Sequence, residues 1–124
     1  MLKIDSEKTI RCTRGDAGTI VITANDNGGN PYTFQVNDTI RLKVMEKNNP
    51  SSILLNKEVK VLETSTSVSV SLTSSETKIG DLINKPSTYW YEVELNPDTS
   101  CNTLIGYDED GAKLFILYPE ANEG

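Results

Sequence analysis

The stretch Ser87-Thr-Tyr-Trp-Tyr-Glu-Val-Glu-Leu95 alternates strictly between two faces. One face carries Tyr89, Tyr91, Val93 and Leu95, and the other carries Trp90, Glu92 and Glu94. A period of two residues is typical of a β-strand and not of a helix. Aromatic side chains bury the most area per residue, so this strand is predicted to lie at the centre of the core.

Other segments show the same alternation, with short turn-forming stretches between them. They are residues 9–14, 19–24, 39–46, 53–62, 65–72, 101–106 and 112–118. The segment 53–62 alternates less well, because Lys57 shares the parity of Leu55 and Val59. A β-bulge near Lys57, or a strand that starts there, would explain this irregularity.

One segment has a different character. Thr73-Ser-Ser-Glu76 has the spacing of a helix capping box, and Ile79, Leu82 and Ile83 follow at helical spacing. The predicted fold is therefore all-β, an antiparallel, immunoglobulin-like β-sandwich with one short helix near residues 75–84. Residues 1–8 are expected to form a loose arm or an edge strand, 9–118 a single domain, and 119–124 an acidic tail.

The composition excludes several classes of function. The chain has 124 residues, a net charge of −6 and no histidine. Its lysines and arginines are scattered, which disfavours binding to nucleic acid or to anionic membranes. Without histidine the commonest general base is missing, and two cysteines alone do not make a zinc site. We therefore expect no enzymatic activity, no cofactor and no metal.

The N-terminus and the cysteines indicate the compartment. No segment approaches the ~20 apolar residues that would span a membrane, and Met1-Leu-Lys-Ile-Asp-Ser-Glu7 has no apolar signal core. We expect a protein made in a cytoplasm without a signal peptide. Cys12 and Cys101 are then expected to be small buried thiols and not a disulfide.

Some short motifs have simpler explanations than a binding site. Arg14-Gly-Asp16 spells an adhesion tripeptide, but turn chemistry alone favours these residues. The acidic stretches 25–29 and 107–111 lack the full ligand set of a calcium loop, so solvated turns are expected. Glu92 and Glu94 are interpreted as polar decoration of an outer face.

Several apolar residues lie on the opposite parity from the main apolar set of their strands. They are Val21, Met45, Trp90, Leu104, Phe115 and Leu117. Either a second layer of the fold covers them, or they form an exposed patch used for docking. Trp90 is the best single candidate for an anchor, since tryptophan is enriched among binding hot spots.

The order of these features resembles a known family. Arg14-Gly-Asp16 follows the first strand, and Asn37-Asp-Thr-Ile-Arg-Leu-Lys-Val44 leads into an alternating strand. Leu54-Leu-Asn-Lys-Glu58, Val68-Ser-Val70, Tyr89–Leu95, Thr103-Leu-Ile105 and Phe115-Ile-Leu-Tyr-Pro119 follow in order. Over nearly its full length the chain resembles the N-terminal domain of upper baseplate proteins from tailed phages of Gram-positive bacteria, including prophage-encoded relatives.

The resemblance implies a non-enzymatic adaptor that docks a receptor-binding or fibre component onto the phage tail. Its expected partners are other tail or baseplate proteins, a homo-oligomer is allowed, and the expected location is the virion tail. The alternative is a small carbohydrate- or cell-surface-binding module, in which Tyr89, Trp90, Tyr91 and Tyr107 would form an aromatic platform.

Overall fold

The computed structural model describes residues 1–26 and 28–120, which fold into nine β-strands and no helix. The strands are β1 (Leu2–Ile4), β2 (Ile10–Thr13), β3 (Gly18–Ile22), β4 (Thr39–Glu46), β5 (Asn49–Lys60), β6 (Val68–Leu72), β7 (Ser87–Leu95), β8 (Asn102–Ile105) and β9 (Lys113–Tyr118). The predicted all-β class is therefore confirmed.

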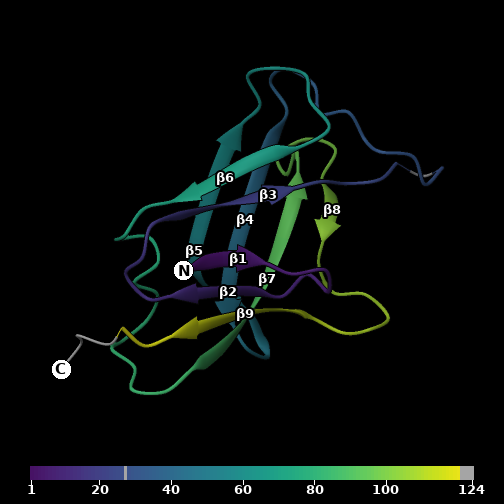
Figure 1. Cartoon of the computed structure of the whole chain (residues 1–124). Helices are drawn as coiled ribbons and strands as arrows, with labels where there is room; N and C mark the ends of the chain where they lie inside the picture. Colours follow the sequence, from purple (N-terminus) through teal and green to yellow (C-terminus); the bar gives the residue numbers. More distant parts are fainter. Residues whose placement is uncertain (27, 121–124) are drawn as a thin grey trace.

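The strands form two sheets. The larger has the order β1-β2-β9-β7-β4-β5, with β8 also paired to β7, and the smaller contains β3 and β6. Figure 1 shows β3 and β6 lying across β4, β5 and β7. Side chains from both sheets form one apolar core, so the arrangement is consistent with a β-sandwich.

The larger sheet is mixed, which corrects the expectation of a purely antiparallel fold. β2 and β9 pair in parallel, from Ile10 opposite Phe115 to Thr13 opposite Tyr118. Strands joined by a short hairpin must run antiparallel, but these two lie about a hundred residues apart in the sequence. No local turn constrains their relative direction.

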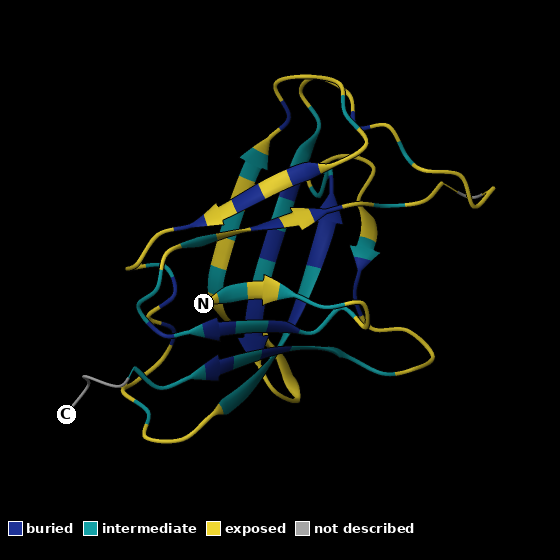
Figure 2. Ribbon diagram, viewed as in Figure 1, coloured by how far each residue is buried: buried dark blue, intermediate teal, exposed yellow. Residues whose placement is uncertain are grey.

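β7 and β4 supply the centre of the core, as the sequence predicts for β7. Tyr91, Val93 and Leu95 are buried, and Tyr89 packs against the same cluster. β4 adds Ile40, Leu42 and Val44, which are fully buried. The alternation of buried and more exposed residues along these strands is visible in Figure 2.

The prediction of a helix near residues 75–84 is wrong, because the structure has no helix there. The capping box does form, since the Thr73 amide donates to Glu76 Oε1 (2.9 Å) and the Glu76 amide donates to Thr73 Oγ1 (3.2 Å). One helical turn follows, and Gly80 then adopts a φ of 65°. Ile79 is buried while Leu82 is 64% exposed, so the apolar residues never share one buried helical face.

β5 is one continuous strand, and its irregularity lies away from Lys57. The register shifts occur opposite Val44, Met45 and Glu46. Lys57 pairs with Leu42 and shares its inward parity, and its Nζ lies 3.1 Å from Glu76 Oε2. An inward-pointing charge on an edge strand opposes unwanted strand pairing, which explains why this lysine interrupts the apolar pattern.

A polar network ties the start of β4 to the end of β7. Asp38 accepts hydrogen bonds from the Tyr32 hydroxyl (3.0 Å), the Gln35 amide (2.8 Å) and Asn96 Nδ2 (3.0 Å). Asn96 Oδ1 in turn accepts from the Thr39 amide at 2.8 Å. The network satisfies main-chain donors where the strands end.

The N-terminal residues form edge strand β1 and not a loose arm, because Leu2–Ile4 pair with β2. The N-terminal amine contacts the Asp16 carboxylate. The tail predicted over residues 119–124 falls largely outside the described residues. Within the described part of the chain, no helix has the length and apolar character needed to cross a membrane.

Candidate functional site

The structure divides the six off-parity apolar residues. Phe115 and Leu117 are fully buried and Met45 is 5% exposed, while Leu104 packs partly against the core. Val21 is 52% exposed on β3 and Trp90 is half-buried on β7. The prediction that Phe115 and Leu117 belong to a docking patch is therefore corrected, because their face of β9 is the core face.

Trp90 belongs to a row of apolar side chains that crosses four adjacent strands. In register, Ile53 on β5 lies opposite Met45 on β4, Met45 opposite Trp90 on β7, and Trp90 opposite Leu114 on β9. We call these four residues the Trp90 row. Trp90 alternates with the buried Tyr91, so the row lies on the face of the sheet that points away from the core.

The Trp90 row reaches solvent at the edge of the sheet and beside Trp90 itself. Ile53 is 46% exposed at the edge strand β5. Tyr107, which is 74% exposed, meets the Trp90 ring edge-on at a centroid distance of 6.1 Å. Sequence reasoning missed Ile53 and Leu114, because only strand pairing places them beside Trp90.

The same outer face becomes charged beside the Trp90 row. Lys43 Nζ lies 2.9 Å from Glu92 Oε1 and 3.0 Å from Glu94 Oε1. Arg41 lies two residues before Lys43 on the same face of β4. It contacts Glu58, and its Nη2 lies 3.2 Å from Asp98 Oδ1. These carboxylates are paired with cations. Glu92 and Glu94 therefore decorate the outer face of the sheet, as the sequence predicts.

Cys101 is exposed and not buried, which corrects the expectation for one of the two thiols. Its Sγ donates to Glu94 Oε2 at 3.3 Å. This hydrogen bond to a carboxylate, together with partial desolvation, raises the pKa of the Cys101 thiol. Burial raises the pKa of Cys12 to about 11. Both thiols are therefore protonated near neutral pH and poorly nucleophilic.

Cys101 is expected to alkylate slowly for an exposed thiol. At pH 7 its rate with iodoacetamide should fall severalfold below that of a free cysteine peptide, because little thiolate is present. Glu94→Gln should increase the rate by removing the charged acceptor, and Glu63→Gln, far along the chain at an exposed position, serves as control. Equal rates in all three proteins would contradict the assigned contact.

The Arg14–Asp16 turn is structural. Arg14 is 8% exposed, and its Nη2 donates to the Gly80 carbonyl at 3.0 Å. The buried hydroxyl of Thr77 accepts from the Gly15 amide (3.0 Å) and contacts the Asp16 carbonyl (2.9 Å). A tripeptide whose arginine is buried is not presented to a receptor, so the interpretation as a turn is confirmed.

The acidic turns also use their oxygens internally. Asp26 Oδ1 accepts from the amides of Gly28 and Asn30, and Asp108 binds Lys113 Nζ at 2.8 Å. Over residues 1–26 and 28–120, no three His, Cys, Asp or Glu side chains group in a way that could hold a metal ion.

The predicted aromatic platform is reduced to two rings. Tyr91 is 2% exposed and its hydroxyl donates to the Lys8 carbonyl at 2.6 Å. Tyr89 packs against the core. Only Trp90 and Tyr107 meet at the surface. No protein-family model matches the chain, and no curated protein shows significant sequence similarity to it.

Proposed function

We propose that this chain is a non-enzymatic structural adaptor of a phage tail or baseplate, which docks a receptor-binding or fibre component. The observation that carries the proposal is the Trp90 row, an apolar strip on the outer face of the larger sheet. The resemblance to upper baseplate domains supplies the class of assembly. The expected partners are other tail proteins, with a second copy of this chain also allowed, and the expected location is the virion. The immunoglobulin-like form of the sandwich is part of this proposal.

The composition of the Trp90 surface supports docking. Interface cores are enriched in aromatic residues and methionine, and they are surrounded by polar rims. Trp90 and Tyr107 provide such a centre, with the buried Met45 beneath them, and the ion pairs of Lys43 and Arg41 provide a rim on one side. Truncation of a central tryptophan can cost ~2 kcal/mol or more of binding free energy.

The test uses particles produced after prophage induction. Trp90→Ser is expected to reduce the amount of this chain in purified particles by tenfold or more, because a ~2 kcal/mol loss weakens binding roughly thirtyfold. Trp90 is half-buried, so the melting temperature should fall by several degrees while the chain stays folded at the temperature of the assay.

Leu62→Ser is the matched control, because Leu62 is 78% exposed and lies outside the Trp90 row. It should leave incorporation unchanged. If the wild-type chain is found only in host cytoplasm, with no phage protein co-purifying, the proposal is wrong.

A second candidate is a carbohydrate- or cell-surface-binding module. One observation favours it: Tyr107 is 74% exposed beside Trp90, which leaves an aromatic ring available for stacking. A glycan array with no binder would remove this candidate, whereas binding that is lost in Tyr107→Ser would support it.

A further inference from the structure

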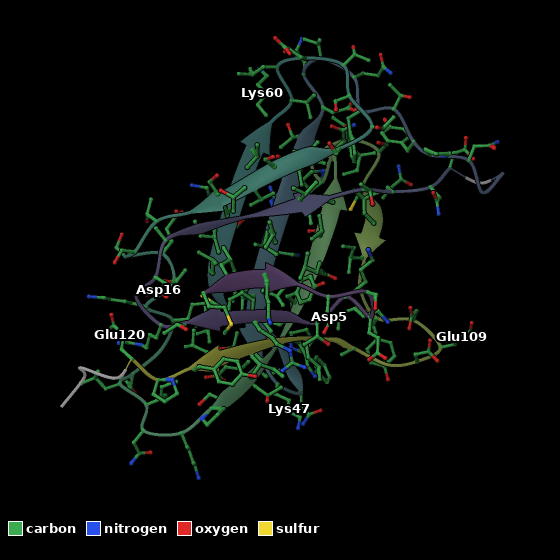
Figure 3. All side chains as sticks on the ribbon, viewed as in Figure 1. Asp5, Asp16, Lys47, Lys60, Glu109 and Glu120 are labelled. Carbon is green, nitrogen blue, oxygen red and sulfur yellow. The ribbon has the colours of Figure 1, made fainter. Side chains whose placement is uncertain are left out.

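A trough runs along β8, on the side of that strand where no other strand pairs. It consists of two hollows of about 390 and 290 Å³. Both are lined by Asn25, Thr103 and Leu104, so they adjoin each other along β8. One hollow extends toward Tyr32 and the other toward Tyr107 and Lys113. In Figure 3, Glu109 marks the tip of the loop that follows β8.

β8 presents unused main-chain groups to this trough. It pairs with β7 alone. Val93 on β7 lies opposite Ile105 and the next residue, Glu94, lies opposite Thr103, which leaves Leu104 on β8 as an extra residue. Within the described residues, no hydrogen bond joins β8 to the segment 23–26 on the other side of the trough. An edge strand of this kind is a template for a further strand.

Asn25 adds a second set of free main-chain groups. The Ala24 carbonyl accepts from the Tyr32 amide, and the Asp26 amide donates to the Asn30 carbonyl, both at 2.8 Å. Main-chain groups alternate in direction along an extended segment. The N–H and C=O of Asn25 therefore point away from residues 30–32, and they have no partner within the described residues.

The side chains of the trough leave polar capacity unused as well. Asn25, Asn102 and Thr103 make no side-chain hydrogen bond within residues 1–26 and 28–120. Lys113 is neutralised by Asp108 at 2.8 Å, but Lys8 beside it has no carboxylate partner in the same residues. Lys8 thus provides an uncompensated positive charge at one end of the trough.

We propose that the trough binds an extended peptide segment of a partner protein, which adds to β8 as a strand and places a carboxylate against Lys8. Main-chain hydrogen bonds to β8 and to Asn25 would supply affinity, and the amide side chains and Lys8 would supply specificity. β8 has only four residues and a bulge, so its main-chain groups alone would bind an added strand weakly. The side chains that line the trough must therefore determine which peptides bind.

The experiment selects random octapeptides, displayed on phage, against the full chain. One enriched peptide is then synthesised, and its dissociation constant and its effect on amide hydrogen exchange are measured. Enriched peptides are expected to carry Asp or Glu. Binding should slow exchange at Asn25 and at those amides within Asn102–Ile105 that do not already bond to β7. Strand addition requires that protection, so an oligosaccharide or peptide that binds without slowing exchange at these amides would overturn the proposal.

Variants locate the site. Thr103 is exposed and lines both hollows, so Thr103→Arg should fill the trough and weaken binding at least tenfold. Thr66→Arg, also at an exposed position, is the matched control and should have no effect. Lys8→Gln should weaken binding severalfold and reduce its salt dependence.

The outcome is separable from that of the proposed docking role. Trp90→Ser should leave peptide binding intact while it reduces incorporation into particles. No enriched peptide, or peptides that bind Thr103→Arg as tightly as the wild type, would overturn the trough proposal. If Thr103→Arg does not fold, the exchange measurement on the wild-type protein decides.

Discussion

Phe115→Ala is expected to lower the free energy of unfolding by about 3–5 kcal/mol, the usual cost of emptying a buried aromatic site. Phe115 is fully buried, and it pairs with Ile10 on β2 and with Tyr89 on β7. The lost ring would leave a cavity where three strands of the larger sheet meet. Urea denaturation followed by circular dichroism measures the change.

The adjacent residue is the matched control. Ile116 points to the outer face of β9 and is half-buried, so Ile116→Ala should cost about 1 kcal/mol. If both variants lose the same stability, or if Phe115→Ala is nearly neutral, β9 presents its other face to the core. Phe115 would then return to the set of docking residues.

Asp38→Ala is expected to destabilise the fold by about 2–3 kcal/mol, because hydrogen bonds to a charged acceptor are among the stronger ones. Three donors would lose the Asp38 carboxylate as their acceptor: the Tyr32 hydroxyl, the Gln35 amide and Asn96 Nδ2. The thermal midpoint and the urea midpoint should both fall. Asp81→Ala is the control, because Asp81 is exposed and its carboxylate accepts no hydrogen bond within the described residues.

The effect of Asp38 should depend on pH. Burial would raise the pKa of Asp38, but the three hydrogen bonds outweigh it and hold that pKa below its ordinary value of 3.8. A lowered folded-state pKa stabilises the fold fully above the ordinary value, and the contribution is lost as pH falls through the folded-state value. The stability gap between wild type and Asp38→Ala should therefore narrow below pH 3.8. A constant gap down to pH 2 would contradict this assignment.

Local patterns predicted the class of fold because alternation is a property of each strand by itself. β7 and β4 each have one clearly apolar face, and that face is buried. β9 is apolar on both faces, since Leu114 and Ile116 alternate with Phe115 and Leu117. Alternation could not decide which face lies inward, and the choice depends on pairing with β2 and β7.

The candidate site could be predicted only in part, because it depends on register. Trp90 is identifiable as an aromatic residue on the wrong parity, but its neighbours Ile53 and Leu114 come from other strands. The trough along β8 has no sequence signature, since it arises where residues 23–26 pass that strand. The capping box of Thr73 and Glu76 forms as the sequence predicts, yet a cap specifies where a helix could start and not that one continues.

The parallel pairing of β2 with β9 has a consequence for synthesis of the chain on the ribosome. Ile10 emerges early, but its partner Phe115 is made only after all the strands between them. At roughly 5–20 residues per second, β2 waits for seconds without its neighbour. The nascent chain must keep β2 from pairing elsewhere, with only the short β1 available to cover one edge. The larger sheet can therefore be completed only after β9 has emerged, and its first-made long edge is paired last.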